Sequence, residues 1–135
     1  MKALDTSVLL ALLEGDQSAR ELVRKLRDVE IVTTEANFLE LAYVAARGSA
    51  RIRGRRREAL GRLRRKLTVL SIDPRAVAEA EGRVLRGDAP SSPLVSGMLG
   101  AFEAAGCDEL FTSDPQDCRG RWRFRVTRFT RRASK

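Results

Sequence analysis

Short apolar runs alternate with longer segments of helical periodicity along this chain, and that alternation limits the folds open to it. The apolar runs lie at 2–5, 29–33, 68–72 and 109–112. Helices are expected at 7–13, 17–28, from a cap at Thr33 or Thr34 to about Arg47, 55–66, 74–86 and 94–105. Strands that alternate with helices form βαβ units and a parallel sheet. The sequence therefore predicts an α/β fold with a central parallel sheet.

Composition indicates a compact soluble protein. The 135 residues suit one domain, and 43% apolar with 33% charged residues is typical of a globular chain. No segment approaches the roughly 20 apolar residues that span a bilayer. The run VLLALL is short, Asp5 precedes it and Glu14 follows it, which is unlike a secretory signal. We therefore expect a cytoplasmic protein without a membrane segment.

The chain has two cysteines, Cys107 and Cys118, and no histidine. These are too few for a disulfide framework or a structural zinc site. Two buried thiols are the favoured interpretation, and a local disulfide is the alternative. Without histidine, acid–base or metal chemistry must use carboxylates, lysines or water.

Positive charge is concentrated in two segments, although the whole chain carries a net charge of +8. Residues 51–67 hold nine Lys/Arg and one Glu, and residues 119–135 hold eight Lys/Arg and no acid. The remaining chain has nine basic and 17 acidic residues. Either basic segment alone could be a solvated arginine-rich surface, as in thermostable proteins. Together they favour a nucleic acid or an acidic protein partner.

Three carboxylates occupy positions of interest. Asp5 and Asp114 each follow a predicted strand, and ligand sites of parallel sheets lie at the carboxyl ends of strands. Taken singly, Asp5 could be a helix N-cap and Asp114 a turn residue. Glu40 is the one charged residue of ANFLELAYVAA, so we expect it on a buried helix with a cationic partner, unless it lies at an exposed edge. Clustered carboxylates with oxygen ligands suit Mg²⁺ or Mn²⁺.

The order of the motifs resembles one family. ALDTSVLLALL places Thr6 and Ser7 after the strand-terminal Asp5, and Glu40 follows on a helix. The segment GCDELFTSDPQDC joins a glycine, an apolar strand, Thr112-x-Asp114 and Asp117. Over nearly the whole chain this resembles the PIN-domain family, small metal-dependent ribonucleases that include the VapC-type toxins. The resemblance implies a single PIN-like domain over 1–135 with a three-layer α/β/α sandwich.

One position departs from the family pattern. The family has Ser-Pro-x-Asp before a helix of small and aliphatic residues, whereas this chain has SSPLVSGMLGAFEAAG. The expected third acid falls on Val95, which cannot bind a metal. Asp88, Ser92 and Ser96 are candidate substitutes, and none is an obvious replacement.

The resemblance implies Mg²⁺- or Mn²⁺-dependent hydrolysis of RNA, in which the acids would hold one or two ions and the ions would activate water. Asp5 would be the central ligand, with Glu40 and Asp114 beside it, Asp117 outside them, and Thr112 orienting the acids. The expected RNA-backbone contacts are Arg53, Arg56, Arg57, Arg64, Arg121, Arg123 and Arg125. Trp122 and Phe124 could stack on bases, but their alternation with arginines favours the core.

Three functions remain open at this stage. The first is a ribonuclease toxin restrained by an antitoxin, for which the resemblance also implies a homodimer. The second is a catalytically weakened PIN fold that binds RNA or a protein without cutting, a possibility that Val95 raises. The third, a structural α/β domain whose acids are all caps, is disfavoured by the matched spacing.

Overall fold

The computed structural model describes residues 1–132 and confirms the α/β class. Its strands are β1 (Lys2–Leu4), β2 (Ile31–Thr34), β3 (Thr68–Leu70), β4 (Glu109–Thr112) and β5 (Arg125–Arg128). Its helices are α1 (Thr6–Leu13), α2 (Gln17–Lys25), α3 (Glu35–Ala45), α4 (Ala50–Lys66), α5 (Pro74–Leu85), α6 (Pro93–Ala105) and the short 3-10 helix η1 (Pro115–Cys118). The strands pair in parallel in the order β3-β2-β1-β4-β5.

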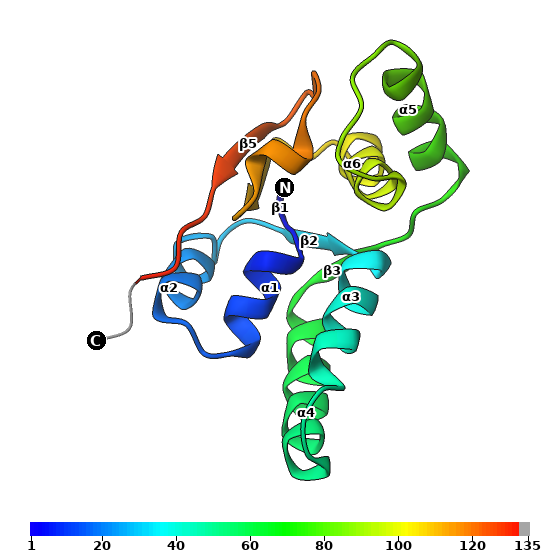
Figure 1. Ribbon diagram of the computed structural model, residues 1–135. Coiled ribbons are helices and arrows are strands. Elements are labelled where there is room, and N and C mark those ends of the chain that lie inside the picture. Colours follow the sequence, from blue (N-terminus) through cyan, green and yellow to red (C-terminus); the bar gives the residue numbers. More distant parts are fainter. Residues whose placement is uncertain (133–135) are drawn as a thin grey trace.

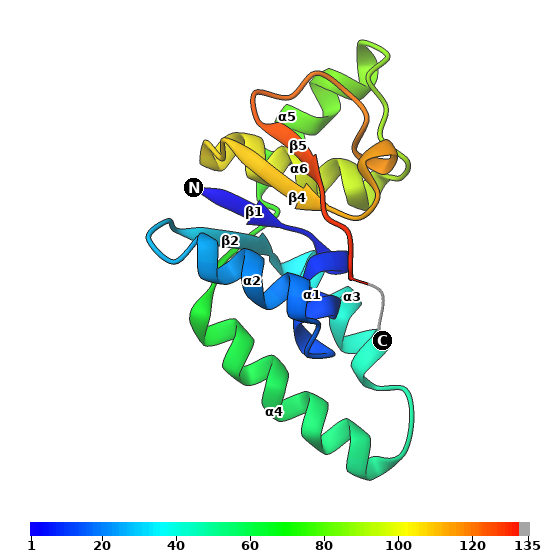
Figure 2. The same ribbon diagram turned by 90° about the vertical axis from the view of Figure 1, so that its left-hand side faces the viewer.

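Helices cover both faces of the sheet, which confirms the three-layer arrangement. Helices α5 and α6 lie on one face, and α1, α2 and α4 lie on the other (Figures 1 and 2). The central strand β1 contributes to both cores because successive side chains of a strand point to opposite faces. Ala3 packs in a cluster with Phe102 of α6, and Leu4 packs in a cluster with Val8 of α1.

Side-chain caps determine where most helices begin. Asp5, Asp16, Thr34, Ser49, Asp73 and Ser92 each accept a backbone N–H from the first turn of the helix that follows. The Ser49 cap explains why α4 begins at Ala50 and not at the predicted residue 55. Near the other end of the chain, β5 begins at Arg125 and adds a strand that is not among the four predicted from the apolar runs.

Helices α3 and α4 form a hairpin that projects from the body (Figure 2). None of the 17 residues of α4 is buried. A narrow apolar stripe runs along it, since Ala59, Leu60 and Leu63 are half-buried. Between residues 1 and 132, no helix is both long and apolar enough to cross a membrane.

Candidate active site

Asp5 connects the ends of two neighbouring strands. Its Oδ1 accepts hydrogen bonds from the Ser7 N–H (3.0 Å), the Ser7 hydroxyl (2.5 Å) and the Val8 N–H (3.4 Å). Its Oδ2 accepts a hydrogen bond from the hydroxyl of Thr112, the last residue of β4. Asp5 is therefore the N-cap of α1, but the cap occupies only one of its two oxygens.

The Asp5 carboxylate is surrounded by neutral donors. Burial raises the pKa of Asp5 above its usual value, while the hydrogen bonds from Ser7, Thr112 and Val8 oppose that rise. Within residues 1–132, Asp5 forms no ion pair with a lysine or arginine. A carboxylate in these surroundings is stabilised by an added cation.

Asp114 follows β4, next to the Asp5 contacts. Its N–H donates to Thr112 Oγ1 over 3.1 Å, and the N–H of Ser113 donates to Ser7 Oγ over 2.9 Å. Asp114 stands at the N-cap position of η1, yet its carboxylate makes no capping hydrogen bond. Its side chain is exposed. The Asp114 carboxylate is thus not committed to the turn role that was its alternative interpretation.

Glu40 lies on the exposed side of α3, so the prediction that this residue is buried is wrong. The apolar neighbours Leu39 and Tyr43 are themselves 62% and 72% exposed. Helix α3 buries only one face, which includes Phe38 and Leu41. Glu40 nonetheless has a specific partner, because the Thr6 hydroxyl donates to its Oε1 over 2.8 Å.

Three predicted acids influence the same buried thiol. Burial raises the pKa of Cys118 to about 12, and the negative charges of Asp5, Asp117 and Asp114 act in the same direction. These three carboxylates therefore lie within electrostatic range of one point. Cys118 and Cys107 are both buried and free, which confirms the favoured interpretation of the cysteines.

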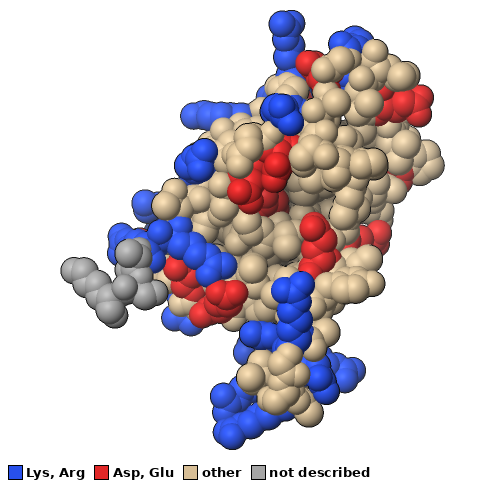
Figure 3. Space-filling model, in the orientation of Figure 1, with Lys and Arg blue, Asp and Glu red and all other residues tan. Residues whose placement is uncertain are grey.

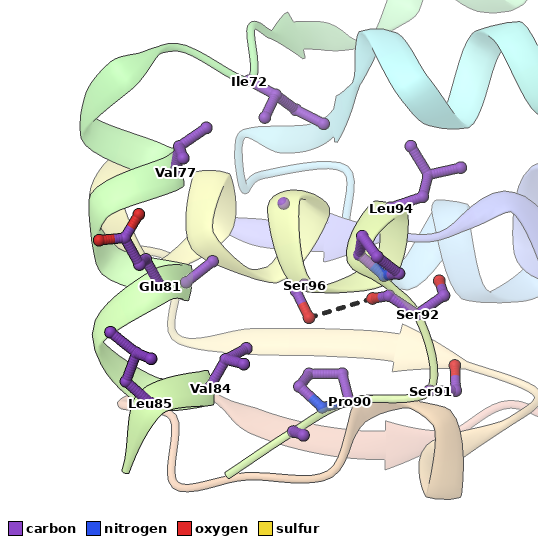
Figure 4. Close-up of a pocket in the computed structure, with 14 residues that line it drawn as sticks. Ile72, Val77, Glu81, Val84, Leu85, Pro90, Ser91, Ser92, Leu94 and Ser96 are labelled. Atoms are coloured by element: carbon purple, nitrogen blue, oxygen red, sulfur yellow. Dashed lines mark hydrogen bonds between the residues drawn. The ribbon is translucent and has the colours of Figure 1, made fainter. Parts of the chain in front are cut away.

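The positions considered for the third acid have other contacts. Val95 is half-buried and packs against the core cluster that contains Met98 and Phe102. The Ser92 hydroxyl accepts from the Val95 N–H, and the Ser96 hydroxyl donates to the Ser92 carbonyl over 3.0 Å. Both serines line an apolar pocket between α5 and α6, where Figure 4 shows the hydrogen bond between them.

Asp88 lies on a different part of the loop before α6. Its N–H donates to the carbonyl of Arg83, and its Cβ would be 3.5 Å from a Cβ at Gly120. The same loop touches η1, because the Ser91 N–H donates to the Asp117 carbonyl over 3.2 Å. Asp88 therefore packs beside the segment that leads into β5.

Two arginines predicted to bind RNA contact the turn that follows α3. Arg53 Nη1 donates to the Gly48 carbonyl over 3.0 Å, and Arg56 Nη1 donates to the Arg47 carbonyl over 2.9 Å. Cations near a helix C-terminus satisfy its free carbonyls and interact favourably with its dipole. These two side chains therefore brace the turn between α3 and α4.

The other arginines predicted to bind RNA differ in how free their side chains are to contact it. Arg64 lies over the ring of Phe38, with its guanidinium carbon 4.5 Å from the ring centroid. Arg57 lies with Arg62 and Arg65 around a shallow hollow on the outer face of α4. Arg121, Arg123 and Arg125 are exposed. Figure 3 shows Lys and Arg gathered over projecting α4 and along the β5 side of the molecule.

The aromatic residues of the basic tail belong to the core. Phe124 is 4% exposed, and Trp122 stacks on it with ring centroids 5.6 Å apart. The guanidinium of Arg83 covers Trp122 at 4.6 Å from the ring centroid. The core-facing interpretation of both rings is therefore confirmed.

Asn37 is a site residue that the sequence reasoning missed. It is 1% exposed, and its Nδ2 donates to Thr6 Oγ1 over 3.1 Å. The available signal was Thr34-x-x-Asn37, a capping-box pattern in which the side chain at the third helical position bonds back to the cap. That pattern predicts the cap, but not the contact with a distant residue of α1.

Comparisons with known proteins agree with this arrangement. The family model described as PIN domain matches residues 2–94. Similar solved structures include DNA-bound VapBC2 from Rickettsia felis (TM-score 0.80, 10% identity, 96% of this chain and 98% of that chain). DNA-bound VapBC from Salmonella typhimurium gives a TM-score of 0.77 at 18% identity over 94% of this chain and 96% of that chain.

A third similar structure is VapC20 from Mycobacterium tuberculosis, described as a sarcin-ricin loop cleaving toxin. Its TM-score is 0.61 at 16% identity, over 84% of this chain and 92% of that chain. No curated protein matches the chain. The match to the family model spans most of the chain, and the strand-end acids and the sheet agree with it. The chain therefore belongs to the PIN-domain family.

Proposed function

We propose that this protein is a divalent-metal-dependent endoribonuclease that acts as the toxin of a toxin–antitoxin pair. The observation that carries the proposal is the pair of strand-end acids, because the Thr112 hydroxyl donates to the Asp5 carboxylate and accepts the backbone N–H of Asp114. Its relatives by fold include VapC20, a toxin described as cleaving the sarcin-ricin loop. The absence of histidine also suits a mechanism based on carboxylates and metal ions.

The donor chemistry fits Mg²⁺ or Mn²⁺. All candidate ligands are carboxylate oxygens, which hard divalent cations prefer. Asp5 has a pKa raised by burial and would gain from a cation. Across residues 1–132, no three acidic or cysteine side chains converge on one metal position. Asp5 would therefore be the anchor, and Asp114 and Glu40, which is held on the Thr6 hydroxyl, would move closer to it when the ion binds.

Each residue then has a distinct task in the proposed reaction. A bound divalent ion supplies an activated water and offsets the charge that develops on the phosphate. Asp5, Asp114 and Glu40 would hold it, with Asp117 farther out. Because the Ser7 and Thr112 hydroxyls donate to opposite oxygens of Asp5, they hold the plane of that carboxylate.

The RNA backbone is proposed to lie across exposed arginines. Arg57 on α4, Arg121 and Arg123 before β5, and Arg125 at the start of β5 are exposed and can contact phosphates. Arg123 also pairs with Glu103 over 3.5 Å. Arg53, Arg56 and Arg64 already contact residues of the α3–α4 hairpin. They would therefore contribute to RNA binding through their positive charge and not through direct phosphate contacts. Such contacts give salt-sensitive binding without base specificity.

An antitoxin is the proposed protein partner, by analogy with the VapBC complexes of similar fold. A groove between α1, α2 and α4 suits an amphipathic acidic segment. Its floor is apolar, with Leu12, Leu13 and Leu63, and its rim carries Arg24, Arg62 and Lys66. Association of two copies is also proposed, because Leu39, Tyr43 and Leu85 expose apolar surface.

The second candidate is a PIN fold that binds RNA without cutting it. Val95, which packs against the core where the family pattern has an acid, favours this candidate. In that case the arginine surfaces would still bind RNA. The two candidates differ in cleavage and in the effect of restoring an acid at position 95.

The deciding experiment is cleavage of structured and unstructured RNA by the purified protein with Mg²⁺ or Mn²⁺. We expect products that disappear with a chelator and with Asp5→Asn, which retains the capping geometry. If the wild-type protein is silent but Val95→Asp cuts, the RNA-binding candidate replaces the nuclease. If both are silent, the catalytic assignment of the acids is wrong.

A further inference from the structure

Asn37 forms a directed hydrogen-bond chain that ends on Glu40. The first step fixes the orientation of its amide. Asn37 Oδ1 accepts from the Thr34 N–H (3.1 Å) and from the Thr34 hydroxyl (2.7 Å). A backbone N–H can only donate, so the atom that faces it must be the amide oxygen. The amide nitrogen of Asn37 therefore faces the other way, toward α1 and α6.

The second step fixes the direction of the Thr6 hydroxyl. Asn37 Nδ2 donates to Thr6 Oγ1 over 3.1 Å, so that oxygen acts as an acceptor toward the amide. A hydroxyl has a single proton. The proton of Thr6 is consequently left for Glu40 Oε1, which lies 2.8 Å away. The chain of donors runs from the β2 backbone through Asn37 and Thr6 to the carboxylate.

The two ends of this chain differ in environment. Asn37 is 1% exposed, and its Nδ2 also donates to Met98 Sδ over 3.0 Å. Its side chain is therefore fixed by contacts at both its oxygen and its nitrogen. Glu40 is exposed and forms no ion pair within residues 1–132. An exposed glutamate ordinarily samples several rotamers. A fixed donor at Thr6 favours the rotamer that points toward the first turn of α1, where Asp5 is the N-cap.

We propose that Asn37 is a positioning residue, which holds Glu40 toward Asp5 through the hydroxyl of Thr6. This inference rests on the proposed metal-dependent nuclease function, and it adds a buried residue that makes no contact with RNA or metal itself. Groups that orient ligands from behind typically change metal affinity or activity by about 10- to 100-fold when removed.

The test separates positioning from the capping role of Asn37. We would compare Thr6→Val, Asn37→Ala and the double variant for kcat and KM in RNA cleavage, for Mn²⁺ binding by calorimetry, and for Tm. Each single change should lower kcat and Mn²⁺ affinity by about 10- to 100-fold. In the double variant, kcat and Mn²⁺ affinity should fall no further than in the more impaired of the two single variants, because both changes break the same hydrogen-bond chain. Thr6→Ser, which keeps the hydroxyl, should restore both values.

A matched control accounts for the lost cap. Asp16→Ala removes the N-cap of α2, whose carboxylate accepts from the Ala19 N–H, and should lower Tm without changing kcat or Mn²⁺ affinity. If Asn37→Ala behaves in the same way, the residue is only a cap and the proposal is overturned.

A structural measurement separates failure of the positioning role from failure of the proposed nuclease function. If the wild-type protein neither cuts RNA nor binds Mn²⁺, the nuclease function fails by itself. A crystal structure of Asn37→Ala then decides the positioning role. Departure of Glu40 from Thr6 supports it, and an unchanged contact between them overturns it.

Discussion

Arg83 Nη2 lies 2.6 Å from Oε1 of Glu103, a carboxylate whose side chain is only 1% exposed. The same Glu103 carboxylate accepts the N–H of Arg123 over 3.0 Å. Because Arg83 belongs to α5, Glu103 to α6 and Arg123 to the segment before β5, this buried group joins three parts of the chain. Its hydrogen-bond and ion-pair partners are Arg83 and Arg123, and neither is an acid of the candidate site, so we assign it a role in stability.

Arg83→Met should destabilise the fold by about 3–5 kcal/mol, because it leaves a buried carboxylate without its main partner. The double variant Arg83→Met/Glu103→Leu should recover much of that loss, since both buried charges are then gone. Urea unfolding measures each free energy. A loss below about 1 kcal/mol for Arg83→Met would contradict a buried pair and match a surface one.

Glycines of α4 and α6 should respond to alanine in opposite directions. A Cβ at Gly54 meets nothing within 4 Å, so Gly54→Ala should stabilise the protein by up to about 1 kcal/mol through helix propensity. At Gly100 a Cβ would lie 2.1 Å from the Ala76 carbonyl oxygen, so Gly100→Ala should be strongly destabilising.

Gly82 of α5 provides the control for these two changes. Its Cβ would meet only the end of the Arg86 side chain at 4.0 Å, so Gly82→Ala should behave like Gly54→Ala. Thermal unfolding of the three alanine variants ranks their stabilities. Equal effects at Gly54 and Gly100 would mean that α5 and α6 do not pack as closely as described.

Lys2 pairs with Asp108 and Glu109 at the start of β1 and β4, and these ion pairs predict that stability depends on pH. The hydrogen bond with Glu109 raises the pKa of Lys2, and the hydrogen bond with Lys2 lowers that of Asp108. Burial opposes ionisation of Glu109, but hydrogen bonds from Thr127 and Lys2 outweigh it and lower its pKa. The carboxylates lose their stabilising contribution as pH falls through their folded pKa values, and Lys2 loses its own as pH rises through its folded pKa.

Lys2→Met should therefore lower Tm at pH 7, where both signs of charge are present, and have a smaller effect at a pH below the folded pKa values of Asp108 and Glu109, where both carboxylates are protonated. Lys25→Met on the exposed end of α2 is the control, with little effect at either pH. An equal loss for Lys2→Met at both pH values would point to packing of its aliphatic stem.

Both cysteines should resist thiol reagents in the folded protein. Burial raises the pKa of Cys107 to about 11 and that of Cys118 to about 12, so thiolate is scarce at pH 8. Labelling with a chromogenic disulfide should be slow in buffer and fast in denaturant. Rapid labelling of one thiol in buffer would show that its segment opens locally. A Cys118→Ser variant identifies which thiol reacts.

RNA binding should weaken when the outer face of α4 loses charge. Arg57→Gln should reduce affinity for all RNA sequences alike and reduce the salt slope by about 1 if its guanidinium contacts a phosphate. Lys25→Gln on α2 serves as a charge-matched control. Fluorescence anisotropy at several salt concentrations gives both quantities. An unchanged slope for Arg57→Gln would place the RNA elsewhere.

Local sequence determined the order and type of the elements as far as β4. Periodicity, caps and breakers act over a few residues, which is why β4 at 109–112 and the cap at Thr34 agree with expectation. The strand-end position of Asp5 follows from the same local signals. Its dual contact, as a cap through Oδ1 and a partner of Thr112 through Oδ2, does not.

Only the tertiary structure decided which faces meet. Glu40 is exposed although its helix is mostly apolar, because the burial of a helix face depends on the neighbours that pack against it. The roles of Arg56 and Arg64 depend in the same way on where α4 folds back on α3. Asn37 reaches Thr6 across 31 positions in the sequence. Contacts of that range depend on packing of the whole sheet and its helices, and no short segment of sequence encodes them.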